Sequence, residues 1–122
     1  MTLLTEQRPV ADLIVYGYLR PGYGTARLRA LKQVLADYCE RHELKLCGVF
    51  TEPPDSDVRH ATAFAGLLDV LRLPTTYGVV LPARSHLGPR RIALEREHQI
   101  TTCGARLIAV REPPKLAAAR TD

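Results

Sequence analysis

The run Leu13-Ile14-Val15-Tyr16-Gly17-Tyr18-Leu19-Arg20-Pro21-Gly22 is the part of the sequence that best predicts the fold. Residues 13–18 are apolar and rich in β-branched and aromatic side chains, which is typical of a strand buried on both faces of a parallel sheet. Pro21 and Gly22 then end the run, because both residue types favour turns. We therefore expect a strand over 13–18, followed by a loop that contains Arg20 and Gly22.

The rest of the core alternates between helical and strand patterns. Leucine and tyrosine recur at steps of three and four over residues 28–38, which predicts a helix with one apolar stripe that ends near His42. Thr25 is the expected N-cap of this helix, because its hydroxyl can accept a hydrogen bond from a first-turn amide. Further strands are expected at 44–50, 77–81 and 105–110, and further helices at about 61–72 and from about Pro89 to just before Gly104.

This βαβαβαβ order predicts a single α/β domain. We expect three layers, with a four-stranded, mostly parallel sheet, helices on both faces and right-handed crossovers. The domain is expected over 12–111, between peripheral tails at 1–11 and 112–122. A chain of 122 residues is long enough for one hydrophobic core of ordinary size.

The composition indicates a reduced, cytoplasmic protein. No apolar run is long enough for a membrane-spanning helix, and the N-terminus lacks the apolar segment of a signal peptide. Cys39, Cys47 and Cys103 form no Cys-x-x-Cys pair, so we expect free thiols. The four histidines have neither the i, i+4 spacing nor the neighbouring cysteines of a metal site. We therefore expect no metal, no cofactor and no membrane association.

The net charge of +4 is concentrated in one window of the sequence. Residues 84–111 contain six arginines against two glutamates, so this window alone carries the whole excess of positive charge. The planar guanidinium group binds paired oxygens, which suits phosphates and acidic protein surfaces. The predicted contacts with nucleic acid or a protein partner are Arg84, Arg90, Arg91 and Arg96. The alternative is a solvated helix face without a partner.

The loop after the first strand is a candidate anion site. Its predicted ligands are Arg20, Gly22, Gly24 and Thr25. Glycine allows the backbone to approach an anion closely, and amides at the start of a helix favour negative charge. The loop lacks the Gly-Lys-Ser/Thr ending of a P-loop, and Gly-x-Gly alone is weak support. The alternative is a simple tight turn.

The Tyr-x-Arg-x-x order of Tyr18 to Gly22 resembles the opening of the catalytic domain of the resolvase/invertase (serine recombinase) family. Similar short matches follow in the family's order, over about residues 12–111. They are Arg29-Ala30-Leu31, Phe50-Thr51-Glu52, Gly66-Leu67-Leu68, Val79-Val80-Leu81 and His86-Leu87-Gly88. The resemblance implies a resolvase-like α/β fold, with the family's reaction centre at the loop after the first strand.

The same resemblance implies that the strand-cleaving chemistry is missing. The family's nucleophilic serine stands at the fifth position of the motif, which is Gly22 here. Arg20 matches an arginine of the family's phosphate clamp, but Phe64 and Ala65 stand where another is expected. In the later signature, Ser85 replaces the aspartate, His86 its adjacent arginine and Pro89 the final arginine, unless Arg90 substitutes through a shift of one residue.

We therefore expect a pseudo-enzyme, a non-catalytic resolvase-like domain that acts as a protein-binding or regulatory module or self-associates as a dimer. One alternative is a DNA-associated accessory or remnant of a site-specific recombination system, and another is a small-anion or nucleotide binder at loop 20–25. A third is a phosphoryl-transfer enzyme with Tyr23, Thr25 or Ser85 as a relocated nucleophile. The long dimerisation helix and the helix-turn-helix domain that follow the core in active small recombinases are not expected in the residues after 111.

Overall fold

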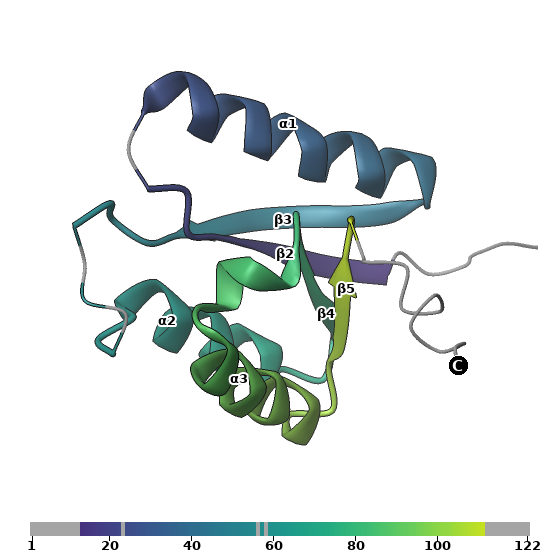
Figure 1. The fold of residues 1–122 in the computed structure, drawn as a ribbon. Helices are drawn as coiled ribbons and strands as arrows, with labels where there is room; N and C mark the ends of the chain where they lie inside the picture. Colours follow the sequence, from purple (N-terminus) through teal and green to yellow (C-terminus); the bar gives the residue numbers. More distant parts are fainter. Residues whose placement is uncertain (1–12, 23, 56, 58, 112–122) are drawn as a thin grey trace, which may run out of the picture.

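The computed structural model describes residues 13–22, 24–55, 57 and 59–111 (Figure 1). The tails expected at 1–11 and 112–122 lie outside the described residues. The described residues form one sheet, three α-helices and a short 3-10 helix.

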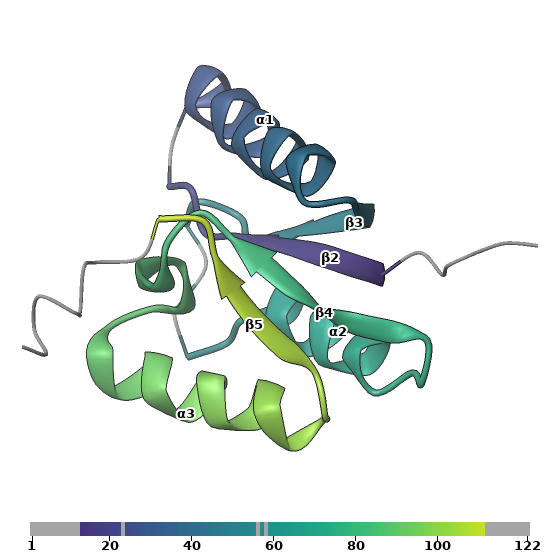
Figure 2. The same cartoon turned by 90° about the vertical axis from the view of Figure 1, so that its right-hand side faces the viewer.

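The sheet has four strands that are all parallel, in the order β3-β2-β4-β5. The strands are β2 (Leu13–Leu19), β3 (Leu44–Thr51), β4 (Thr76–Leu81) and β5 (Arg106–Ala109). Helix α1 (Thr25–Arg41) covers one face, and α2 (Thr62–Leu71) and α3 (Arg90–Thr102) cover the other (Figures 1 and 2). The expected three-layer α/β architecture is therefore confirmed.

The two faces of the sheet bury two separate apolar clusters. Val15 and Leu19 of β2 pack against Leu35 and Cys39 of α1. Tyr18 points to the other face, where a larger cluster includes residues of β4, α2 and α3. This division follows from the strand geometry, since successive side chains alternate between faces. Each fully buried leucine contributes about 1.5–3 kcal/mol of favourable transfer free energy.

Gly17 allows α1 to approach the middle of β2 closely. A Cβ atom at this position would lie 2.7 Å from Cδ1 of Leu35. The absence of a side chain at Gly17 therefore sets the spacing between α1 and the sheet. This close approach explains a glycine inside a central strand, where the residue otherwise weakens the structure.

Two details of the connections differ from the sequence prediction. Thr25 is the first residue of α1 and not its N-cap, because Gly24, with a φ of 108°, takes the non-helical cap position without a side-chain hydrogen bond. The 3-10 helix η1 (Arg84–Leu87) was not expected. Four residues are too few to produce a periodic hydrophobic pattern.

Candidate functional site

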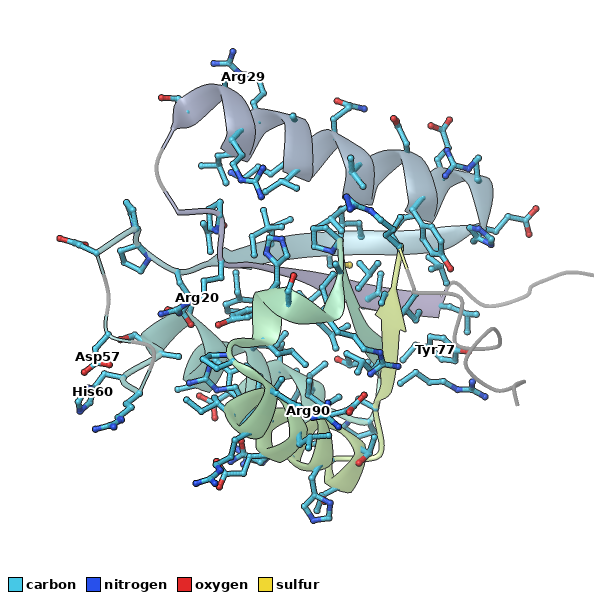
Figure 3. The ribbon with its side chains drawn as sticks, in the orientation of Figure 1. Arg20, Arg29, Asp57, His60, Tyr77 and Arg90 are labelled. Carbon is cyan, nitrogen blue, oxygen red and sulfur yellow. The ribbon has the colours of Figure 1, made fainter. Side chains whose placement is uncertain are left out.

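The candidate site lies at the carboxyl edge of the sheet, where the loops after β2, β3 and β4 meet. The first connection leads from β2 to β3 on one side, and the chain then crosses to β4 on the other side of β2. Strand order therefore reverses at β2, and ligands of open parallel sheets bind at such a switch point. Arg20 lies at this edge in Figure 3.

Two segments that carry the family resemblance are in direct contact here. The backbone N–H of Arg20 donates a hydrogen bond to Nδ1 of His86 at 2.9 Å. The backbone N–H of Glu52 donates to the carbonyl oxygen of Leu19 at 3.0 Å, which joins the ends of β2 and β3. The structure thus brings the first motif and the later signature together.

Gly22 is exposed and has a φ of 76°. An ideal Cβ atom built on it meets nothing within 4 Å among the surrounding described residues. The position therefore has room for a side chain, but its left-handed backbone disfavours any residue other than glycine. The position that the resemblance relates to the nucleophile thus presents only backbone.

His86 is buried, with 7% of its surface exposed. Its Nδ1 accepts the N–H of Arg20, so the proton of the neutral ring is on Nε2. Burial lowers the pKa of His86, and the nearby charges of Arg27 and Arg111 lower it further. The ring is therefore neutral at pH 7 and does not supply the positive charge that an arginine would have at this position.

Glu52 is fully buried and connects three elements. Its Oε2 accepts hydrogen bonds from the Tyr18 hydroxyl at 2.6 Å and the Phe64 N–H at 2.9 Å, and its Oε1 accepts one from the Ala63 N–H at 3.1 Å. Burial, followed by the contact with Glu52, raises the pKa of Tyr18. The carboxylate thereby caps α2, whose own N-cap residue, Ala61, offers no side-chain hydrogen bond.

No local sequence pattern points directly to this role of Glu52. The residue was part of the match Phe50-Thr51-Glu52, but the α2 amides that it caps come ten residues or more later. A carboxylate that caps a helix from a preceding strand cannot be recognised from local spacing. Its position after an apolar strand was the only available hint.

The predicted anion loop forms part of a pocket of about 310 Å³. Gly22, Gly24 and Thr25 line this pocket together with Glu52, whereas Arg20 is not among its lining residues. Arg27 is held beside the loop, since its Nε donates to the carbonyl oxygen of Pro21 at 3.2 Å. The structure therefore brings three of the four predicted residues together around one pocket, and it adds Glu52 as a lining residue.

The arginines of the basic window do not form one patch. Arg90 and Arg91 are exposed in the first turn of α3, and Arg84 forms an ion pair with Glu97. Arg106 lies over the ring of Tyr77, 5.7 Å from its centroid, and Figure 3 shows Tyr77 at the end of the sheet opposite Arg20. The concentration of charge in the sequence therefore overstates its concentration in space.

Arg96 departs most from its expected place on a surface. Only 7% of it is exposed, and its guanidinium donates to the carbonyl oxygen of Leu87 at 2.9 Å and lies 5.2 Å from the ring centroid of Phe64. It shares a face of α3 with the buried Ile100, one helical turn later. The expectation that Arg96 belongs to an exposed cluster is thus corrected, because its side chain connects η1, α2 and α3.

Within residues 13–22, 24–55, 57 and 59–111, no group of three His, Cys, Asp or Glu side chains could hold a metal ion. The three cysteines are free. No helix in the same part of the chain is both long and apolar enough to cross a membrane.

The sequence matches no family model and no curated protein. Among solved structures, one neighbour is the C-terminal catalytic domain of ISC1926 TnpA, an IS607-like serine recombinase. Its TM-score is 0.72 and its identity 15%, over 87% of this chain and 76% of that chain. Another is the N-terminal catalytic domain of TP901-1 integrase, with a TM-score of 0.64 and 14% identity over 82% of this chain and 77% of that chain.

Identities this low establish the fold and not the activity. The resolvase-like fold expected from the sequence is confirmed, because the chain has the fold of serine recombinase catalytic domains.

Proposed function

We propose that this chain is a degenerate serine recombinase domain that does not cleave DNA and that acts as a protein-binding or regulatory module. The observation that carries this proposal is Gly22, which presents no side chain where the resemblance places the nucleophile. A covalent phosphoseryl intermediate needs a hydroxyl at that point.

The surroundings of Gly22 also support the loss of catalysis. Positive charge stabilises a phosphate in the transition state, and the neutral His86 provides none where the family has an arginine. Glu52, the buried acid at this edge, has both carboxylate oxygens engaged by Tyr18 and the α2 amides. His86 and Glu52, which lie where the resemblance places the reaction centre, thus form hydrogen bonds that stabilise the fold.

A relocated nucleophile has little support from these contacts. Ser85 is exposed beside His86, but the Nδ1 of that ring already accepts the Arg20 N–H. Thr25 lines the same pocket as Glu52, whose oxygens are already engaged. Tyr23 lies outside the described residues. His86 is therefore not an available base for Ser85, and Glu52 is not an available base for Thr25.

Association with DNA through the start of α3 would use Arg90 and Arg91, which are both exposed. Two phosphate contacts give weak binding with a shallow salt dependence. Binding of a small anion is a second candidate function, favoured by the pocket that Gly22, Gly24 and Thr25 line. Glu52 also lines this pocket, but its carboxylate oxygens are bonded to Tyr18 and the α2 amides. The proposed protein-binding function also includes self-association, in which the domain binds a second copy of itself.

The proposal is tested by incubating the protein with supercoiled DNA that carries recombination sites, and by searching for protein–DNA adducts that survive denaturation. An active serine recombinase is the positive control. The wild type is expected to give no adduct, and so is Gly22→Ser, since the arginine clamp is also missing. An adduct with the wild type would overturn the proposal.

A further inference from the structure

The clearest unassigned feature of the surface is a groove between η1 and α3, with a volume of about 400 Å³. The residues that line it include Arg84 and Leu87 of η1 and Arg90, Ala93, Leu94 and Glu97 of α3. Leu94 is 57% exposed, the largest value among the exposed large hydrophobic side chains of the described chain. Single exposed leucines are common, but Leu94 also lines this groove together with the apolar side chains of Leu87 and Ala93.

Two interactions hold the walls of this groove together. Arg84 of η1 forms an ion pair with Glu97 of α3. On the buried side of α3, Arg96 donates a hydrogen bond to the carbonyl oxygen of Leu87, the last residue of η1. The walls of the groove are therefore fixed by contacts within the chain, which lowers the entropic cost of binding.

Positive charge lies at the end of the groove where α3 begins. Arg90 lines the groove and Arg91 follows it, and both are exposed. The first turn of α3 contains no acidic residue, and Pro89 provides no side-chain cap. Glu97 is already paired with Arg84, so it does not offset the charge of Arg90. A carboxylate from outside would therefore find a favourable position beside Arg90.

We propose that the η1–α3 groove binds a segment of a partner protein that combines a large apolar side chain with a neighbouring aspartate or glutamate. The apolar side chain lies against Leu87, Ala93 and Leu94, and the carboxylate pairs with Arg90. This assignment rests on the proposed protein-binding function and names its surface and the chemistry of its partner. The fit of a carboxylate to the guanidinium gives the contact its direction.

Charge and shape favour this occupant over two others. A second copy bound with its α3 N-terminus against this one would bring Arg90 and Arg91 close to their symmetry equivalents, and like charges repel. Nucleic acid would match the arginines but would leave Leu94 without an apolar partner. A DNA backbone also needs a series of cations along its path, and the groove with its rim offers Arg90 and Arg91 besides the paired Arg84.

The probe is a library of short random peptides displayed for selection on the full wild-type chain, and the affinity of the enriched peptides is then measured on wild type and on Leu94→Asp. Enriched peptides are expected to place a large apolar residue close to an acidic one. Leu94→Asp and Arg90→Glu should each weaken their affinity by at least about tenfold. The amide NMR shifts that the peptides cause should centre on residues 84–97. Leu94→Ala, which only shortens an exposed side chain, should show the same direction of effect.

Matched controls separate the groove from general surface effects. Leu73→Asp changes another exposed leucine, 50% exposed and located just after α2, and should leave affinity unchanged. Arg29→Glu reverses the charge of an exposed arginine on α1, on the other side of the sheet from Arg90 (Figure 3). It should also leave affinity unchanged.

Several results would overturn the groove assignment. These are an unenriched library, peptides that bind Leu94→Asp as well as wild type, and a wild-type dimer that Leu94→Asp dissociates. A DNA complex that Arg90→Glu abolishes, without any peptide binding, would also overturn it. None of these results bears on DNA cleavage, which the adduct assay measures separately.

Discussion

The carboxyl edge of the sheet and the η1–α3 groove use polar side chains in opposite ways. At the carboxyl edge, Glu52 and His86 are buried and bonded to neighbouring parts of the chain. At the groove, Arg90 is exposed beside an exposed leucine. The first region supports the fold, and the second offers contacts to another molecule. The residues that resemble an active site are therefore not the ones that we propose bind a partner.

Glu52 provides the strongest test of this contrast. Glu52→Leu removes the acceptor of the Tyr18 hydroxyl and of two α2 amides, and all three donors are then left without it in the interior. We expect a loss of about 3–4 kcal/mol in the free energy of unfolding, measured by urea denaturation. The exposed Glu95→Leu is the control and should change stability by less than about 0.5 kcal/mol. A small effect at Glu52 would mean that the carboxyl edge is not held by this network.

Arg96 should show the next largest effect. Arg96→Ala removes the hydrogen bond to Leu87 and the contact with the Phe64 ring, and it leaves a gap between η1 and α3. We expect a loss of about 2 kcal/mol in the free energy of unfolding. Arg91→Ala, an exposed neighbour on the same helix, should be close to neutral. Equal effects at both positions would contradict the structural role of Arg96.

His86 should make stability depend on pH. Its pKa in the folded chain is lower than the ordinary value of 6.5, so the unfolded chain binds more protons in the interval between the two values. The contribution is fully present above pH 6.5 and is lost as the pH falls below it, towards the folded-state pKa. Denaturant titrations from pH 7 to about pH 5 should show this loss.

Arg27 offers a way to test the cause of that pH dependence. Its charge is the second contribution to the lowered pKa of His86, after burial. Arg27→Gln should therefore raise the folded-state pKa and reduce the loss of stability in acid. Arg29→Gln, on the same helix, should leave the pH profile unchanged. Identical profiles for the two variants would rule out the electrostatic contact between α1 and η1.

The smallest effect on stability is expected at the rim of the groove. Arg90→Gln combined with Arg91→Gln changes two exposed side chains and should alter the free energy of unfolding by less than about 0.5 kcal/mol. The same variant should weaken binding of acidic partners. A substantial loss of stability would mean that these arginines belong to the fold, and the contrast between the two regions would fail.

The fold could be predicted from the sequence because each element has a strong local pattern. The apolar run of β2 and the leucine stripe of α1 place these elements within a few residues of their observed bounds. Glycines and prolines mark the ends of most of the others. The N-cap of α1 is Gly24, one residue before the predicted Thr25. The positive φ of Gly24 is a property of the folded backbone that the local sequence pattern does not reveal.

The candidate site was less predictable, because its contacts join residues far apart in the chain. Glu52 and the α2 amides, or Arg20 and His86, become neighbours only when the strands assemble. Arg96 was misplaced because arginine is rarely buried, and its contact with Phe64 is a tertiary one. No sequence pattern distinguishes Leu94 as an exposed leucine, since its exposure depends on how α3 packs against η1.

We propose that this domain, which has the fold of serine recombinase catalytic domains, lacks their strand-cleaving chemistry. Relaxation of a supercoiled plasmid tests this claim most directly, because it detects strand breakage whichever residue attacks. The protein should leave the distribution of topoisomers unchanged, while an active serine recombinase acting on a plasmid with its own sites changes it. Relaxation that grows with time and protein concentration, together with a covalent protein–DNA adduct, would show that the domain does cleave DNA.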